Sequence, residues 1–192
     1  MGKTYNQLDE RLHSWIAAQH SFFVATAPKR PGGHVNLSPK GHADTCAVLD
    51  ERTVTYLDLT GRGAETAAHL GDDGRITLMF CAISGLPRIL RLYGQGRIVL
   101  PSEQRWDELA ACFRPAAAPV TLLWSRSSAS RTPAATRSRS TTTPETAALF
   151  DQWAVRKDEA AMAAYRAQRN GRSIDGLSAL PMPASDRQAG PG

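Results

Sequence analysis

The stretch Arg88-Ile-Leu-Arg-Leu-Tyr-Gly-Gln-Gly-Arg-Ile-Val-Leu100 decides the fold of this chain. Apolar and polar residues alternate along it, which is typical of a β-strand with one buried face. Gly94 and Gly96 stand in its middle, where glycine marks a bulge or a kink. The stretch therefore predicts one long strand that bends at its glycines.

Shorter segments with strand character precede this long strand. They are Ser21–Ala27, His34–Ser38, the hairpin Thr45–Leu49 with Thr53–Leu57, and the apolar run Arg75–Cys81. The segments PKRPGG at 28–33 and Pro39-Lys-Gly41 interrupt the pattern as loops do. Short strands with turn signals and few crossovers predict an α+β fold, a small antiparallel β-barrel with peripheral helices.

Four helices are expected around this barrel. They are Tyr5–His20 with one apolar face, Ala64–Leu70 ended by Gly71, the capped Ser102–Cys112, and the charged Glu145–Asn170. We assign residues 1–112 to a barrel domain and residues 145–180 to a C-terminal helix and tail that pack on it. Residues 181–192 are expected to be a disordered tail.

Residues 113–144 differ in composition from the rest of the chain. From Trp124 to Pro144 every residue is Ser, Arg, Ala, Thr, Pro or Trp, and all six types have G or C as the middle base of their codons. This pattern indicates a GC-rich gene translated out of frame; the alternative is a Ser/Arg/Thr linker that evolved as such. Because few apolar residues are available for burial, we expect disorder here. A barrel needs another strand at this point, and the written sequence supplies only Pro119–Trp124.

Charge and cysteine content exclude several functions. Five of the 23 Lys and Arg residues and none of the 18 acidic residues fall between 114 and 144, so the remaining 18 basic residues balance the acids. The pI near 9.4 therefore does not predict a nucleic-acid partner. No apolar run is long enough for a membrane helix and no signal peptide is recognisable, so a cytoplasmic location is expected.

The three cysteines do not predict a disulfide framework or a zinc site. They are odd in number and widely spaced, with no C-x-x-C pattern. We expect them to be small buried or half-buried residues. The histidines likewise have no partner at ligand spacing, so no metal site is expected, and no Ser-His-Asp or paired-carboxylate pattern stands out.

An ordered set of segments resembles the pyridoxamine 5′-phosphate oxidase-like flavin-binding split-barrel family. The segments are SFFVAT at 21–26, HVNLSPKG at 34–41, VTYLDLTGRGAET at 54–66, RITLMF at 75–80, PRILRLYG at 87–94, and NGRSIDGL at 170–177. The resemblance covers about residues 5–112 and 147–180. No single segment decides it, but the order is fairly specific.

The resemblance implies a homodimer that binds FMN, or alternatively a deazaflavin, across the dimer interface. On the strand that ends at Pro39-Lys40 it implies cofactor contacts from Asn36, Ser38 and Lys40. The turn Thr60-Gly61-Arg62-Gly63 corresponds to the turn that holds the phosphate, although the usual Ser-Arg-Lys of the family is here Gly-Arg-Gly. Arg88 lies on the strand that corresponds to the one bordering the flavin in the family.

The chemistry of these residues is compatible with cofactor binding and also with an ordinary structural role. Free N–H groups at a helix N-terminus together with Arg62 suit a phosphate, but Thr60–Gly63 also reads as an ordinary capped turn. Lys40 suits the phosphate or the N1–C2=O edge of a flavin, or it is a solvated loop lysine. Arg88 and Arg91 face opposite sides of a strand, so at most one of them points at a given site. Arg88, next to Pro87, is preferred; a surface cation is the alternative.

The expected function is an FMN-dependent oxidoreductase acting on a small-molecule substrate of unknown identity, with no nucleic-acid or membrane partner. The C-terminal Arg-x-His signature of true pyridoxamine phosphate oxidases is absent, so vitamin B6 oxidation is not assigned. A non-enzymatic flavin-binding barrel and an impaired product of a frameshifted gene remain as alternatives.

Overall fold

A computed structural model describes residues 3–41, 44–59, 64–84, 86–113, 119–132 and 159–179. In chain order its elements are β1 (Lys3–Tyr5), α1 (Glu10–Ala17), β2 (Ser21–Thr26), β3 (Asn36–Gly41), β4 (Cys46–Asp50), β5 (Thr53–Leu59), α2 (Glu65–Asp72), β6 (Arg75–Cys81), β7 (Ile89–Val99), α3 (Trp106–Ala110), β8 (Pro119–Thr132) and α5 (Glu159–Asn170).

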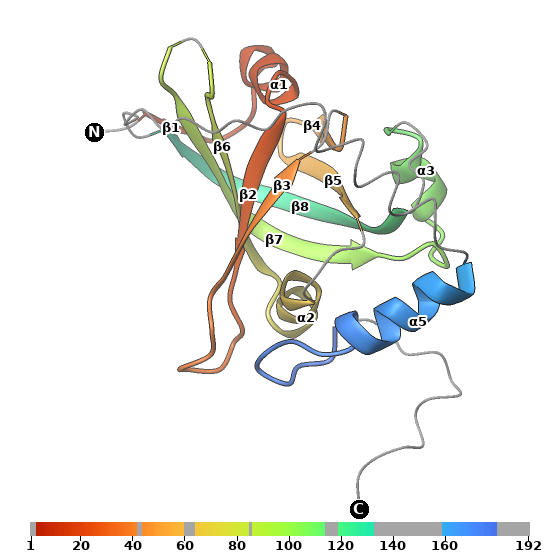
Figure 1. The fold of residues 1–192 in the computed structure, drawn as a ribbon. Coiled ribbons are helices and arrows are strands. Elements are labelled where there is room, and N and C mark those ends of the chain that lie inside the picture. Colours follow the sequence, from red (N-terminus) through yellow and green to blue (C-terminus); the bar gives the residue numbers. More distant parts are fainter. Residues whose placement is uncertain are drawn as a thin grey trace, which may run out of the picture.

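The strands form one antiparallel sheet in the order β3-β2-β6-β7-β8-β5-β4, and β1 pairs with β8. The sheet curls into a barrel whose two edge strands, β3 and β4, are not paired with each other (Figure 1). Within this opening, the Lys40 side chain of β3 reaches Asp58 of β5, the strand next to β4. We call the region where β3 faces β5 the seam. The α+β split barrel predicted from the sequence is confirmed.

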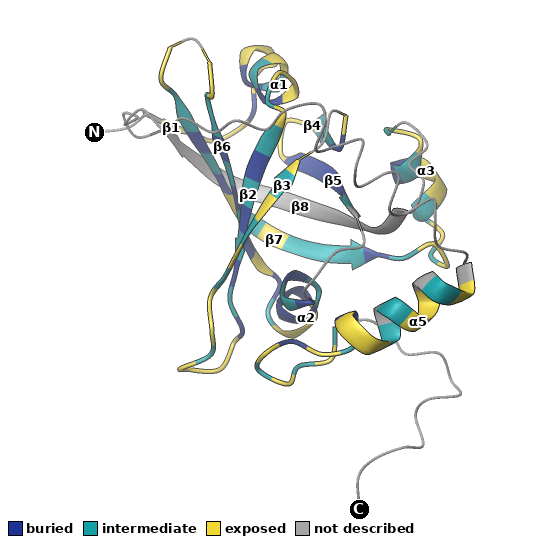
Figure 2. Cartoon of the chain, in the orientation of Figure 1, coloured by how far each residue is buried: buried dark blue, intermediate teal, exposed yellow. Residues whose placement is uncertain are grey.

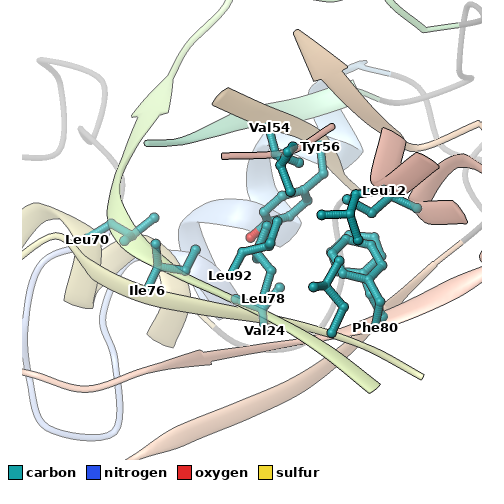
Figure 3. Packing of buried hydrophobic residues seen from close by; sticks show 13 residues of the cluster. Leu12, Val24, Val54, Tyr56, Leu70, Ile76, Leu78, Phe80 and Leu92 are labelled. Atoms are coloured by element: carbon teal, nitrogen blue, oxygen red, sulfur yellow. The ribbon is translucent and has the colours of Figure 1, made fainter. Parts of the chain in front are cut away.

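The alternating pattern of each strand decides which side chains fill the barrel. Phe22, Val24 and Thr26 of β2 are buried and their neighbours are half-buried, and β6 repeats the pattern. Figure 2 shows this alternation along both strands. Phe22 lies at the centre, with ring centroids 5.3 Å from Tyr56 and 5.2 Å from Phe80. Figure 3 shows the cluster around these rings, which includes Leu12 from α1 and Leu92 from β7.

The long strand of the sequence prediction is β7. It spans Ile89–Val99 between β6 and β8, and its register against β8 shifts between Tyr93 and Gly94. The predicted bulge at Gly94 is therefore confirmed. β6 has the predicted bounds, and the hairpin of β4 and β5 also forms as expected.

The first helix is shorter than predicted. It begins after Asp9, whose carboxylate accepts a hydrogen bond from the backbone N–H of Leu12 at 2.8 Å, and it ends at Ala17. Tyr5 lies in β1 instead, opposite Ser130 of β8. The apolar face of the helix is correct, because Leu8, Leu12 and Ile16 are all buried. Strand pairing overrides the helical pattern before the cap.

The strand β3 is longer than predicted, and Pro39 does not break it. β3 continues to Gly41, with Pro39 opposite Phe23 of β2. β3 is an edge strand of the sheet. An edge strand tolerates proline, since the missing N–H is needed only where a second neighbour would accept it.

The structure differs from the expectation for residues 113–144 at Pro119–Thr132. This segment forms β8, which pairs with β5 on one side and β7 on the other. Backbone hydrogen bonds hold a strand between two neighbours whatever its composition, which the low-complexity argument did not include. Residues 114–118 and 133–158, including the first half of the predicted C-terminal helix, lie outside the described residues, as do 180–192. The reading-frame hypothesis stays a prediction.

The cysteines are reduced and differ in exposure. Cys46 and Cys81 are half-buried as expected, but Cys112 is exposed at the end of α3. Burial raises the pKa of Cys46 to about 12, so its thiol stays protonated at neutral pH. In the part of the chain that is described, no helix combines the length and the apolar character needed to cross a membrane.

The segment 171–179 after α5 forms a compact turn, which we call the hook. Backbone hydrogen bonds close it, including Ser173 N–H to Leu177 O at 2.9 Å, and Gly176 adopts φ +78. The side chain of Asp175 is 1% exposed and accepts hydrogen bonds from Arg30 Nη2 at 2.7 Å and from His34 Nδ1 and backbone N at 2.8 Å. The hook is therefore fastened to the loop between β2 and β3.

We expect the contribution of Asp175 to stability to depend on pH. The hydrogen bonds from His34, and then Arg30, hold the pKa of this carboxyl well below its usual value of 3.8. A lowered pKa stabilises the fold above the unfolded-state value, and the effect is lost as pH falls through the folded-state value. In urea unfolding, the difference between wild type and Asp175→Asn should be constant from pH 7 to 5 and shrink below about pH 4. A difference that grows on acidification would contradict this.

Candidate functional site

The inner face of β3 carries three polar residues where a barrel interior is usually apolar. Asn36, Ser38 and Lys40 pair with Thr26, Val24 and Phe22 of β2, all of which are buried on the inner side. Residues paired across two strands share a face. These three side chains are half-buried, so they line the seam rather than the outer surface.

Asn36 is the centre of a hydrogen-bond network. Its Nδ2 donates to Thr26 Oγ1 at 3.1 Å and to Thr66 Oγ1 of α2 at 3.0 Å, while its Oδ1 accepts from Ser38 Oγ at 2.7 Å. Both amide hydrogens are therefore used within the protein. Asn36 ties β3 to the first turn of α2 and has no hydrogen left to donate to a ligand.

The network extends to a buried histidine on α2. His69 is fully buried, and its Nδ1 lies 3.1 Å from Thr26 Oγ1. Thr26 Oγ1 also accepts a hydrogen bond from Asn36, so this hydroxyl connects His69 through Nδ1, not Nε2, with the Asn36 network. Among the described residues this Nε2 has no partner. His69 is thus a buried structural member of the network.

An ion pair crosses the seam. Lys40 Nζ of β3 donates to Asp58 Oδ1 of β5 at 2.5 Å, and each side chain is 21% exposed. Among the described residues, Asp58 is the only partner of the ammonium group, which retains two hydrogens for a further acceptor. The seam therefore presents a fixed, solvent-reachable cation that is positioned by an acid.

Three of the eight predicted site residues are brought together, and one is not. Asn36, Ser38 and Lys40 share the seam, whereas Thr60, Gly61, Arg62 and Gly63 lie outside the described residues. The guanidinium of Arg88 lies 4.7 Å from the ring centroid of Trp15 on α1. β2 and β6 stand between β3 and β7 in the sheet, so Arg88 is not part of this cluster.

Sequence reasoning missed four residues: Asp58 of the seam, and Thr26, Thr66 and His69 of the hydrogen-bond network around Asn36. Only Asp58 carried a usable signal, because an acid at the end of an otherwise buried strand needs a cationic partner. The threonines and His69 carried none, since their contacts join segments up to 43 residues apart.

A second concave region lies beside the network. An open groove of ≈ 470 Å³ runs over the end of β2, the start of β6 and the middle of β7, with Ala25, Thr77 and Gly94 among its lining residues. Thr26 also lines it, so the groove and the seam meet at this residue. Of the predicted cofactor contacts that the structure describes, Asn36, Ser38, Lys40 and Arg88, none lines the groove.

Comparison with known proteins decides the family. The sequence profile described as pyridoxamine 5′-phosphate oxidase matches residues 8–137, which is more than half of the chain. The chain belongs to the pyridoxamine 5′-phosphate oxidase family. This confirms the resemblance of the strand and turn segments.

Individual relatives of this family member are similar over part of its length. The pyridoxamine 5′-phosphate oxidase family protein ustO of Aspergillus flavus is 44% identical over 103 residues, covering 53% of this chain and 41% of that protein. The chain thus spans about two fifths of this curated relative.

Two solved structures are also similar. A HupZ variant from Group A Streptococcus has a TM-score of 0.52 and 19% identity, over 66% of this chain and 99% of that one. An FMN-binding protein from Syntrophomonas wolfei has a TM-score of 0.42 and 12% identity, over 62% and 80%. At these identities the likeness concerns the fold alone.

Proposed function

We propose that this chain binds FMN with its phosphoryl end at the seam and acts as a flavin-dependent oxidoreductase. The observation that carries the proposal is the polar inner face of β3, with Lys40 held by Asp58 of β5. A dianionic phosphate requires hydrogen-bond donors and positive charge. Lys40 Nζ supplies the charge and two unused ammonium hydrogens, whereas the hydroxyl hydrogen of Ser38 is donated to Asn36 Oδ1.

The start of α2 adds backbone donors to this arrangement. Its N-cap residue, Ala64, makes no side-chain hydrogen bond to the first turn. Uncapped N–H groups at a helix N-terminus favour an anion. The predicted phosphate segment Thr60–Gly63 precedes Ala64 directly in the sequence and lies outside the described residues. We place the phosphate at Lys40.

The residues of the seam would bind and orient the cofactor rather than react. FMN, when bound, supplies hydride and electron transfer. Lys40 would hold the phosphate, and Asp58 would fix the direction of the ammonium group. The Asn36 network would keep β3 at a constant distance from α2. Because the flavin would supply the redox chemistry, a dedicated acid or base side chain is not required.

We also propose that the chain acts as a homodimer through the outer face of the sheet. On the side of β2 opposite the core, Phe23 pairs with Pro39 and Met79, and Ala25 pairs with Leu37. Leu37 is 63% exposed, and Phe23 and Met79 are half-buried in the single chain. Exposed apolar residues that adjoin across neighbouring strands favour an interface with a second copy.

Replacing Met79 by glutamate is expected to give monomers. The carboxylate would face its own copy across a two-fold interface and be removed from water, which is unfavourable without a partner. Light scattering after gel filtration measures the mass directly. Gln104→Glu adds the same charge at an exposed position next to α3 and should leave the dimer intact. Equal masses for wild type and Met79→Glu would contradict this interface.

The function is tested on the purified chain. Flavin absorbance and a co-purifying mass equal to FMN support the proposal, while a deazaflavin mass would replace FMN by that cofactor. NAD(P)H-dependent reduction of the flavin with turnover on an added acceptor distinguishes an oxidoreductase from a cofactor-binding barrel. A folded chain that binds neither cofactor, even after reconstitution, would refute the proposal.

A further inference from the structure

The hook contacts two segments that are remote from it in sequence and that lead into the Asn36 network: the loop between β2 and β3, and the start of α2. Asp175 fastens it to Arg30 and His34, 145 and 141 residues away. The backbone N–H of Ile174 donates to Glu65 Oε1 at 3.2 Å, 109 residues away. The hook therefore contacts the loop before β3 and the first residue of α2 at the same time.

These two contacts flank the hydrogen bond that connects β3 with α2. His34 stands two residues before Asn36, and Glu65 stands immediately before Thr66. Asn36 and Thr66 are bonded to each other at 3.0 Å. The hook thus closes a ring of contacts around this bond, from His34 through Asp175 and Ile174 to Glu65.

The hook contacts the loop between β2 and β3 through a small residue, Gly33, and a charged one, Asp175. A side-chain carbon added at Gly33 would lie 2.2 Å from Pro28 Cγ and 3.2 Å from Asp175 Oδ2, so a larger residue there would displace Pro28 and crowd the carboxylate. Asp175 is 1% exposed and receives three hydrogen bonds from two residues. Hydrogen bonds to a buried carboxylate are strong and directional, so this contact restrains both partners.

We infer that Asp175 is a positioning residue for the seam, which acts through the hook to fix the Asn36–Thr66 contact and thereby the placement of Lys40. The inference rests on the proposed FMN site. Asp175 touches neither the network nor Lys40. It sets the separation of the two segments that carry them.

The test compares wild type, Asp175→Asn and the control Asp107→Asn, which removes one negative charge from an exposed position on α3. Hydrogen exchange is measured on all three without cofactor. Asp175→Asn is expected to raise exchange in 30–38 and 64–70 and to leave β6 and β7 protected. FMN affinity should fall by roughly threefold to tenfold, since the lost bonds act on the site indirectly. Asp107→Asn should match wild type in both measurements.

A double-mutant cycle separates positioning from a general loss of stability. Thr66→Ala removes the acceptor of the Asn36 bond. If Asp175 acts through that bond, the effects of Asp175→Asn and Thr66→Ala on FMN affinity are less than additive. Additive effects, or uniform loss of protection in β6 and β7, would overturn the inference. Wild-type protein that fails to bind FMN would refute the proposed function, and the exchange comparison would still decide whether the hook fixes the two segments.

Discussion

Replacing Phe22 by alanine is expected to cost about 3–5 kcal/mol of unfolding free energy, as for other buried phenylalanines. The ring is 2% exposed and contacts Tyr56 edge-on and Phe80 in a stack. It thus joins β2 with β5 and β6, on two sides of the barrel. Truncation would leave a cavity that these rings fill only in part. Urea unfolding followed by circular dichroism measures the loss.

Two variants serve as comparisons for Phe22→Ala. Leu86→Ala removes a large apolar side chain that is 88% exposed, and should change stability by at most about 0.5 kcal/mol. Tyr56→Phe removes a buried hydroxyl that has no partner among the described residues, so we expect no loss. A cost for Phe22→Ala as small as that for Leu86→Ala would show that the barrel core is not packed as described.

Replacing Lys40 by methionine is expected to weaken FMN binding by roughly 10–100-fold. A hydrogen bond to a charged group contributes about 1.5–3 kcal/mol, and each 1.4 kcal/mol is tenfold in affinity. The substitution keeps most of the aliphatic stem and removes the ammonium group. It also leaves Asp58, 21% exposed, without its partner and with a negative charge beside the phosphate. Fluorescence titration of FMN measures the change.

Lys29→Met is the matched control for Lys40→Met. Lys29 is exposed on the loop between β2 and β3, and its contact with Asp72 comes from its backbone N–H. The control removes the same positive charge from the loop that precedes β3, outside the proposed phosphate site. It should bind FMN as wild type does. Equal weakening in both variants would indicate a general electrostatic attraction instead of a contact at the seam.

Regular elements with one buried face were predictable because their pattern repeats. Burial alternates over the full length of β6 and over the first four residues of β7, and Leu8, Leu12 and Ile16 mark one helical face. Element ends were less predictable where a partner strand decides them. Tyr5 joins β1 because β8 offers a free edge, and Pro39 stays in β3 because that strand lies at the edge.

β8 itself shows the limit of composition. Its low-complexity sequence indicated disorder, yet β5 and β7 both require a partner at that place, and backbone pairing does not depend on side-chain type. Strand order, which no local pattern reveals, creates that requirement.

The candidate site was predictable by residue type but not by arrangement. The resemblance pointed to Asn36, Ser38 and Lys40, which share one face of β3. Their roles depend on Asp58 and Thr66, which come from other elements and were not selected from the sequence. Asn36 proved to be a structural hub, and the contact of Arg88 with Trp15 had no signal in the sequence.

Parallel titration of the wild-type chain with FMN and with riboflavin, which lacks the phosphate, tests the central claim most directly. If the seam holds the phosphoryl end, FMN binds at least about tenfold more tightly than riboflavin, and Lys40→Met removes most of that difference. Equal affinities for the two flavins, or a folded chain with no saturable binding of FMN up to about 1 mM, would contradict the account.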